Sequence, residues 1–278
     1  MGEFARCPDE AVKAAEAVCG PVVLSGITDR RGSAVWKGTG VLATVAIKAG
    51  YGEGEEITAR ESAVLDQLPG CTVTAGRYDR GVWYVTPWLE GPSTWDVFKP
   101  IRKGDGGREY ALASAVHLCR AVADLHAGGW VHSDLQPAHG VHTDHGVRLL
   151  DLSWAWSPSF PPSPVFQGGI THLLSPELAA AVESGERPVR ATVESDVHAL
   201  AGTLWTCITG RWPLDYDAAG LGPDIGPSAR RAAIATRTVP LCSDETWPAL
   251  QAPLRDVLRA PAEHRPTAPE LATVLAEL

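Results

Sequence analysis

The chain of 278 residues lacks the features that mark several classes of protein. Its six cysteines include no closely spaced pair, which argues against a disulfide framework or a zinc site and favours free thiols in a reducing cytoplasm. No run of lysine and arginine occurs and the formal net charge is −9, so we expect neither a nucleic-acid nor a membrane surface. No stretch approaches the roughly 20 apolar residues of a membrane span, and the amino end lacks the basic and apolar parts of a secretory signal. The sequence therefore predicts a soluble, cytoplasmic protein.

The residues that are present predict a packed fold with a β-rich first part. Hydrophobic residues make up 45% of the chain, whose length suffices for one large domain or for two lobes around a cleft. The segments VLATVAIKAG (41–50) and GVWYVTPWL (81–89) predict strands, the second stopped by Pro87. Between them, EEITARESAVLDQLPG (55–70) has apolar residues at helical spacing. We expect one helix within a small sheet.

Helical patterns dominate from about Tyr110. Apolar residues recur at helical spacing in 110–129 and 268–278, and 195–210 is apolar almost all round, as in a helix buried at the centre of a domain. Ser195 or Asp196 stands where the N-cap of the second helix is expected.

The change of pattern predicts a boundary near EGPST (90–94). We expect a small lobe at 1–90, a hinge at 91–94 and a helical lobe at 95–278. Within the last of these, the proline-rich segment 157–166 is expected to form one exposed loop.

Six short motifs between residues 45 and 271 occur in the order in which protein kinases carry them. They are VAIK, ARESAVLDQL, LHAGGWVHSDLQPAH, RLLDLSWA, LLSPE and HRPTAPEL. Each motif alone is a weak signal, but the order and spacing together are specific. The chain thus resembles the protein kinase-like superfamily. The resemblance implies an α+β, bilobal fold, with a β-rich N-lobe that carries one main helix and a larger, mainly α-helical C-lobe.

The resemblance also implies roles for single residues, with ATP and Mg²⁺ as cofactors. Lys48 would hold the phosphates of ATP, and Glu61 would pair with Lys48. Asp134 would be the catalytic base, and Asp151 would bind magnesium. The remaining implied residues are those around the nucleotide base, namely Thr86, Trp88 and Leu89, and those that brace the larger lobe, namely Glu177, Arg265 and Asp196.

The segment 25–40 departs from the family pattern because it holds no G-x-G-x-x-G. Gly26 and Gly32 are the glycines that fall in the right neighbourhood, so the backbone clamp on the phosphates is in doubt. Ser133 replaces the arginine that would pair with a phosphate on the activation loop, so switching by loop phosphorylation is not expected.

The catalytic loop departs from the pattern in two further places. Gln136 replaces the usual lysine, which removes a positive charge beside the transferred phosphoryl group. His139 replaces the asparagine that binds magnesium, although magnesium prefers oxygen ligands. Leu152 and Ser153 follow Asp151 where Phe and Gly are usual, so the apolar residue is kept.

Several residues allow two interpretations. His132 is expected to be a structural core histidine, and His142 and His145 are expected to be solvated. His139 would either contact the metal or a phosphate, or be a relic without a role. Two tryptophans, Trp154 and Trp156, follow Asp151. They would either pack beneath the cleft or offer an aromatic platform to a peptide.

The function expected from the resemblance is ATP-dependent phosphoryl transfer to a Ser/Thr hydroxyl of a peptide or protein. Lys48, Asp134 and Asp151 are retained, and these are the parts that the chemistry needs most. A weaker resemblance is to the kinase domains of lanthipeptide synthetases. The alternatives are a pseudokinase that binds ATP or a peptide and serves a partner enzyme subunit, and a small-molecule phosphotransferase.

Overall fold

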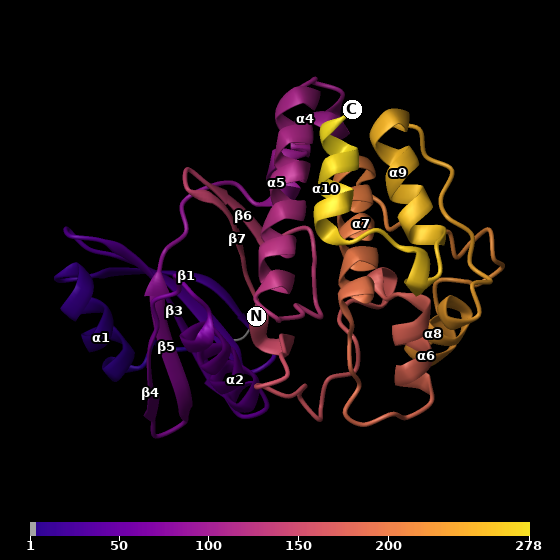
Figure 1. The fold of residues 1–278 in the computed structure, drawn as a ribbon. Coiled ribbons are helices and arrows are strands. Elements are labelled where there is room, and N and C mark those ends of the chain that lie inside the picture. The colour runs from indigo at the N-terminus through magenta and orange to yellow at the C-terminus, as the bar shows by residue number, and fades with distance from the viewer. Residues whose placement is uncertain (1–3) are drawn as a thin grey trace. The chain divides into compact units, whose positions relative to one another are not determined.

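The computed structural model describes residues 4–278, so the first three residues of the segment that was examined for a signal lie outside it. The chain divides into two compact units (Figure 1). The amino-terminal unit holds the residues up to Leu89 together with Leu152–Trp154. The carboxyl-terminal unit holds Glu90–Asp151 and Ala155–Leu278. Elements of both kinds are present, so the predicted α+β class is confirmed.

A five-stranded antiparallel sheet forms the centre of the amino-terminal unit. Its order is β1-β2-β3-β5-β4, and the strands are β1 (Val23–Arg30), β2 (Ser33–Thr39), β3 (Thr44–Tyr51), β4 (Thr74–Tyr78) and β5 (Gly81–Pro87). Both predicted strands exist, with β5 ending at Pro87. β3 starts at Thr44 because the preceding residues form a turn, in which the Gly40 N–H donates to the Ala43 carbonyl at 3.0 Å.

Two helices contact this sheet, α1 (Asp9–Cys19) and α2 (Gly54–Gln67). Successive side chains of a strand point to opposite faces. Ile47 belongs to the core cluster that contains Ala11 and Ala15 of α1, whereas Lys48 pairs with Glu61 of α2. The two helices therefore cover opposite faces of the sheet. The sequence predicted α2 but not α1, so the expectation of one helix in this region was wrong.

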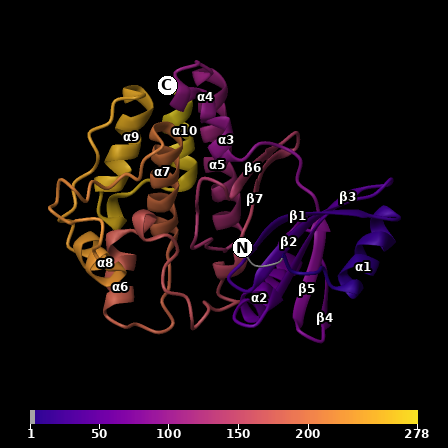
Figure 2. The same cartoon turned by 180° about the vertical axis from the view of Figure 1, so that it is seen from behind.

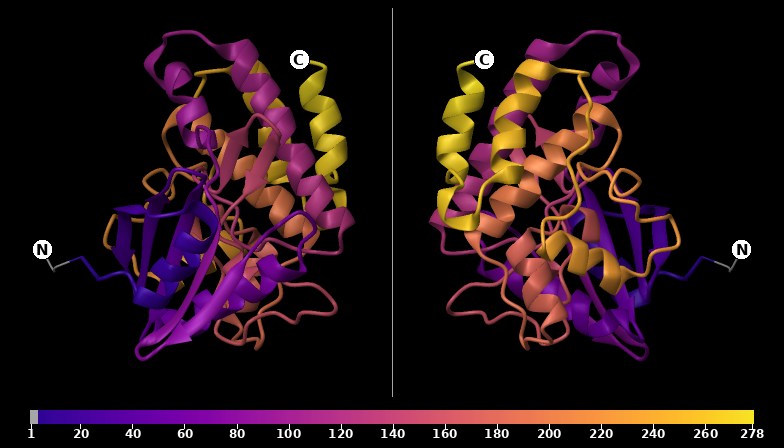
Figure 3. Two further views of the ribbon diagram at one scale, coloured as in Figure 1. Left: turned by 90° about the vertical axis from the view of Figure 1, so that its left-hand side faces the viewer. Right: turned by 90° about the vertical axis from the view of Figure 1, so that its right-hand side faces the viewer.

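The carboxyl-terminal unit is mainly helical, and four of its helices run side by side (Figures 1 and 2). These are α5 (Arg108–Ala127), α7 (Val193–Thr209), α9 (Pro248–Arg259) and α10 (Ala268–Ala276). The shorter helices are α3 (Thr94–Val97), α4 (Lys99–Lys103), α6 (Pro176–Glu183) and α8 (Pro227–Ala235), with 3₁₀ turns at Thr171–Leu173 and Ala262–His264. A hairpin of β6 (Gly140–Thr143) and β7 (Gly146–Leu149) lies beside α5 (Figure 3).

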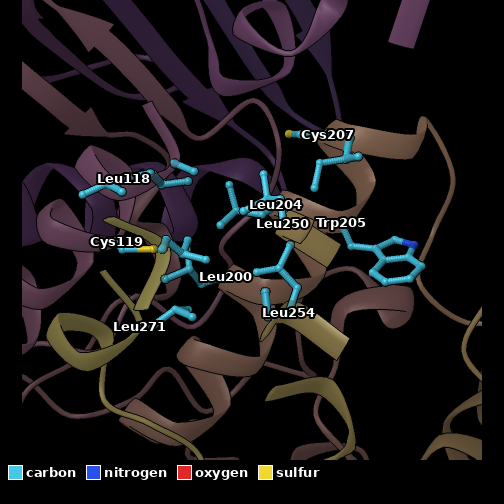
Figure 4. Packing of buried hydrophobic residues seen from close by; sticks show 14 of the residues in the cluster. Leu118, Cys119, Leu200, Leu204, Trp205, Cys207, Leu250, Leu254 and Leu271 are labelled. Carbon is cyan, nitrogen blue, oxygen red and sulfur yellow. The ribbon is translucent and has the colours of Figure 1, made fainter. Parts of the chain in front are cut away.

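The core of this unit is built around α7. Figure 4 shows leucines of α5, α7, α9 and α10 meeting around it. Leu200 and Leu204 of α7 are fully buried. The N-cap of α7 is Thr192, whose side chain accepts the Ser195 N–H while the Ser195 hydroxyl accepts the Thr192 N–H. The expectation that Ser195 or Asp196 would be the cap was therefore wrong by one turn, which leaves Asp196 free of that role.

The proline-rich segment 157–166 has no regular secondary structure, but it is not one exposed loop. Ser157, Ser163 and Phe166 are buried. Phe166 is 2% exposed, so it fixes the end of the segment in the core, because its transfer from water stabilises the packed arrangement. Separately, no helix among residues 4–278 is both long and apolar enough to cross a membrane.

Candidate active site

Lys48 and Glu61 form an ion pair in the amino-terminal unit. The Lys48 Nζ lies 2.5 Å from the Glu61 Oε2, and the two side chains are 16% and 5% exposed. Lys48 faces α2 because it alternates with the core residues of β3, and Glu61 is on the buried face of that helix. The predicted pairing is present, and its burial makes a salt bridge of this kind costly to break on one side.

The end of β5 carries three residues that were predicted to surround a nucleotide base. Thr86 pairs with Ala46 of β3, and it is half-buried. The Trp88 N–H donates to the Thr44 carbonyl at 2.9 Å, so it is used within the sheet. Pro87 has no N–H to donate. Within residues 4–278 the Leu89 N–H has no hydrogen-bond acceptor.

Gly26 and Gly32 of the first hairpin are both in crowded places. Gly26 lies in β1 against the ring of Phe4, where a Cβ would be 2.8 Å from a ring carbon. Gly32 is in the two-residue turn between β1 and β2, and it has a φ of +71° beside Arg31 at +54°, as a type I′ turn requires. A Cβ on Gly32 would lie 2.4 Å from the Tyr51 carbonyl oxygen. The turn geometry explains Gly32 without any ligand.

In the carboxyl-terminal unit, Asp196 of α7 anchors the loop that follows α5. Its carboxylate accepts the His132 N–H at 2.6 Å and the Ser133 N–H at 2.9 Å, and the His126 Nε2 lies 3.1 Å away. The Ser133 backbone has a φ of +70°, an unusual conformation for a residue with a side chain. These hydrogen bonds hold the loop in the strained conformation, and they place Asp134 directly after it.

His132 is a structural histidine, as predicted. Its ring is fully buried, the Asp134 N–H points to its Nδ1 at 3.3 Å, and its Nε2 lies 3.1 Å from the Leu150 carbonyl. Burial lowers the pKa of His132 below its ordinary value. The neutral ring thus joins the loop of Asp134 to the strand end before Asp151.

The β6–β7 hairpin brings His139 and Asp151 together. Gly140 pairs with Leu149, and the Leu150 N–H donates to the His139 carbonyl at 2.8 Å, so the residues before and after the hairpin meet at its open end. His139 Nε2 lies 3.5 Å from Asp151 Oδ2. On the other side, the His139 N–H donates to the Gln136 carbonyl at 2.9 Å, which closes the loop. A spacing of twelve residues therefore becomes a contact.

Asp134, His139 and Asp151 converge. Each offers one ligand atom, and these atoms lie within 4.8 Å of one another. Of the four non-glycine residues with positive φ within residues 4–278, one, Asp151 at +56°, belongs to this cluster, and another, Ser133, directly precedes Asp134. Backbone strain of this kind persists where the surrounding structure enforces it, often at functional sites. Two carboxylates and an imidazole can hold a divalent cation.

Gly169 is a residue of the site that sequence reasoning missed. A Cβ on Gly169 would lie 1.8 Å from the Asp134 Oδ1, so the backbone approaches this carboxylate more closely than any other residue type would allow. Asp134 is only 9% exposed. The signal in the sequence was the Gly168-Gly169 pair before LLSPE, which marks a place where the backbone needs room.

Glu177, in the first turn of α6, and Arg265 form the expected ion pair. The Arg265 Nη1 and Nη2 donate to the two Glu177 carboxylate oxygens at 2.5 and 2.9 Å, and Nη1 also donates to the Glu194 carbonyl at 3.0 Å. Burial raises the pKa of Glu177, but hydrogen bonds from Arg265 and Ser175 outweigh it and lower the pKa to about 2. The pair ties α6 to the segment before α10.

The structure also decides how the histidines of the hairpin and Trp156 are placed. His142 is not solvated, because its Nε2 lies 3.0 Å from the Thr94 hydroxyl and burial lowers its pKa to about 4. His145, in the hairpin turn, is exposed as expected. Trp156 packs rather than offering a free platform, since its indole N–H donates to the Ala191 carbonyl at 3.0 Å and Arg190 lies over its ring.

The chain is similar to bacterial serine/threonine kinases over part of its length. A probable serine/threonine-protein kinase of Clostridium perfringens is 25% identical over 189 residues, which are 64% of this chain and 26% of the relative. The probable serine/threonine-protein kinase PknB of Lactococcus lactis is 30% identical over 112 residues, 39% of this chain and 17% of the relative. PrkC of Bacillus subtilis, a serine/threonine-protein kinase, is 32% identical over 113 residues, 39% of this chain and 16% of the relative. No model of a known protein family matches the chain.

Proposed function

We propose that the chain is an ATP-dependent phosphotransferase of the protein kinase type that acts on a Ser/Thr hydroxyl of a peptide or protein. The observation that carries the proposal is the convergence of Asp134, His139 and Asp151 within 4.8 Å. The Lys48–Glu61 pair and the similarity to serine/threonine kinases support it. The relatives are several times longer than the matched segments, so their further activities are not transferred to this chain.

In this proposal the amino-terminal unit supplies the contacts to the nucleotide. Lys48, held in place by Glu61, donates hydrogen bonds to phosphate oxygens and balances their charge. The Leu89 N–H is the backbone donor for the base, with Thr86 and Trp88 beside it. Gly26 and Gly32 remain predicted phosphate contacts, although the crowding at both positions already accounts for glycine there.

The donor set of the carboxyl-terminal unit fits a magnesium ion in part. Asp151 and Asp134 offer the carboxylate oxygens that magnesium prefers, whereas His139 offers nitrogen. When bound, the ion would balance charge on the phosphates of ATP. Gln136 lies in the same loop, where its backbone carbonyl accepts the His139 N–H. We assign to its side chain a contact with a phosphate.

Asp134 orients the acceptor hydroxyl. Asp134 directly follows the strained turn at Ser133. The Asp196 carboxylate fixes that turn by accepting the backbone N–H groups of His132 and Ser133. The hydroxyl proton passes to Asp134 while the γ-phosphoryl group moves to the hydroxyl oxygen and ADP leaves. Positioning and charge balance account for most of the catalysis in this chemistry, so a loop fixed by two backbone hydrogen bonds suits it.

Nucleotide titration tests the proposal. Saturation at 100 times the dissociation constant should raise the free energy of unfolding by about 2.7 kcal/mol. Lys48→Met should weaken ATP binding, whereas Lys13→Met, which changes an exposed lysine of α1, should not. The absence of any stabilisation by ATP, ADP or a non-hydrolysable analogue, with and without a divalent cation, would contradict the proposal.

A second candidate function is a pseudokinase, a subunit of a larger complex that binds ATP or a peptide without chemistry. The observation that favours it is the contact of Gly169 with Asp134, which leaves that carboxylate nearly buried. Offering the purified chain Ser/Thr peptides, including precursor peptides of lanthipeptides, and small hydroxylated molecules separates the candidates. Transfer to a peptide supports the first proposal, transfer to a small molecule alone supports a small-molecule phosphotransferase, and ATP binding without transfer to any acceptor supports the second candidate.

A further inference from the structure

The His139 ring is held in one orientation by the residues around it. Its Nδ1 lies 2.8 Å from the Asp134 carbonyl oxygen, and its ring stacks on that of His132 with the centroids 6.1 Å apart and an interplanar angle of 23°. The side chain is 13% exposed. A ring fixed on one edge and one face presents its remaining nitrogen, Nε2, in a set direction.

The hydrogen bond at Nδ1 identifies the tautomer. A carbonyl oxygen has no proton to give, so the Asp134 carbonyl can only accept, and His139 Nδ1 must carry the proton. In the neutral ring Nε2 then holds a lone pair. Histidine ligands of metals are commonly fixed in this way, with one ring N–H donating to a backbone carbonyl while the other nitrogen binds the ion.

In this tautomer Nε2 of the neutral ring lies opposite the Asp151 carboxylate, an arrangement that a shared cation would stabilise. Nε2 and the Asp151 Oδ2 are 3.5 Å apart. A charge-assisted hydrogen bond between them would be shorter, about 2.7–2.9 Å. Two ligands that each lie about 2.1 Å from one ion are instead separated by about 3–4 Å. The Asp134 carboxylate, within 4.8 Å of both, would complete a set of three donors.

We infer that His139 binds the divalent cation through Nε2 and makes the site prefer Mn²⁺ to Mg²⁺. The inference rests on the proposed function, because the cation is the one that accompanies the nucleotide. Magnesium accepts imidazole poorly, whereas first-row transition metals bind mixed nitrogen and oxygen donors more tightly, and manganese also tolerates carboxylates and water. His139 is then a metal ligand that changes which divalent cation the site selects, and not a residue without a role.

Metal titration of the full chain loaded with ADP tests this inference. The loss of the electron paramagnetic resonance signal of free Mn²⁺ gives the manganese affinity, and competition with Mg²⁺ gives the magnesium affinity. His139→Asn should reduce the preference for Mn²⁺ over Mg²⁺ by about 10–100-fold, the usual effect of altering a metal's ligand shell. His145→Asn, which changes the exposed histidine of the hairpin turn, should leave the ratio unchanged.

A second readout covers the case in which His139→Asn does not fold. In the unaltered chain, Mn²⁺ should broaden the nuclear magnetic resonance signals of the His139 ring more than those of the His145 ring. An unchanged metal ratio in a folded His139→Asn chain, or a His139 ring that does not respond to Mn²⁺, would overturn the inference. If ADP and ATP bind but the ratio ignores His139, the inference fails and the proposed function stands. A His139-dependent preference for Mn²⁺ in a chain that binds no nucleotide would support the metal preference and contradict the proposed function.

Discussion

Gly169 sets how close the backbone can come to the Asp134 carboxylate. An alanine Cβ at this position would lie 1.8 Å from Asp134 Oδ1, and no positive φ forbids alanine there, so the expected response is a rotation of the Asp134 side chain. Displacement of a catalytic group by about 1 Å can cost about 100-fold in rate. We expect Gly169→Ala to lower phosphoryl transfer by about that factor while the chain stays folded.

Steady-state kinetics on a Ser/Thr peptide, with circular dichroism to verify folding, would measure the effect of Gly169→Ala. Gly222→Ala is the matched control, because a Cβ at Gly222 meets nothing within 4 Å. Full activity in Gly169→Ala would show that Asp134 does not need its present orientation, which would count against its proposed role.

Single residues were predictable from the sequence where a short motif fixes both partners. The Lys48–Glu61 and Glu177–Arg265 pairs and the buried His132 all follow from motifs and are present. The Gly168-Gly169 pair marked a place where the backbone needs room, but the contact with Asp134 was not predictable, since that side chain is 35 positions away in the chain. His142 was misplaced for a similar reason, because its partner Thr94 belongs to α3.

At the scale of elements, the ion pair of Glu177 and Arg265 joins α6 to the segment before α10. Arg265 is 7% exposed and donates to Glu177 with both terminal nitrogens. Nearby, burial lowers the pKa of His198 on α7 to about 3, with the positive charge of Arg265 contributing in the same direction. His198 is therefore neutral near neutral pH and cannot replace Arg265 as the partner of Glu177.

Arg265→Ala should destabilise the chain by about 2–3 kcal/mol, less than the loss expected for a pair buried on both sides, because the Glu177 side chain that loses its partner is 34% exposed and partly screened by water. Urea unfolding would measure the change. Arg259→Ala, which removes an exposed arginine of α9, should alter the free energy of unfolding by less than about 0.5 kcal/mol. A loss for Arg265→Ala as small as that of the control would show that the pair contributes little to stability.

Elements with a strong local pattern were predicted well, and those defined by distant contacts were not. α2, α5, α7 and α10 have the apolar spacing of helices and appear within a few residues of the predicted bounds. The hairpin that joins His139 to Asp151 is short, and its register depends on packing beside α5. The N-cap of α7 is Thr192 and not the predicted Ser195 or Asp196. The Asp196 carboxylate instead accepts the backbone N–H of His132.

At the scale of the whole molecule, the sequence indicated the α+β class and the change from strands to helices after about residue 90. The order of the sheet, β1-β2-β3-β5-β4, places β5 between β3 and β4. Neighbouring segments of the chain do not determine such an order, because strands also pair across intervening helices, as β3 and β5 do across α2. Three departures from the kinase pattern, Ser133, Gln136 and His139, lie in the loop that carries Asp134, whereas the missing glycine motif lies in the amino-terminal unit.

ADP release and phosphopeptide formation from ATP by the purified chain would report directly on phosphoryl transfer at Asp134 and Asp151. We expect turnover that Asp134→Ala and Asp151→Ala abolish, while Asp144→Ala, which changes an exposed aspartate in the hairpin turn, leaves it unchanged. Turnover that survives Asp151→Ala would belong to a contaminant. Absence of turnover in the unaltered chain with Mg²⁺ and with Mn²⁺, together with its appearance in His139→Asn, would contradict the account and identify a pseudokinase that lost its chemistry at one residue.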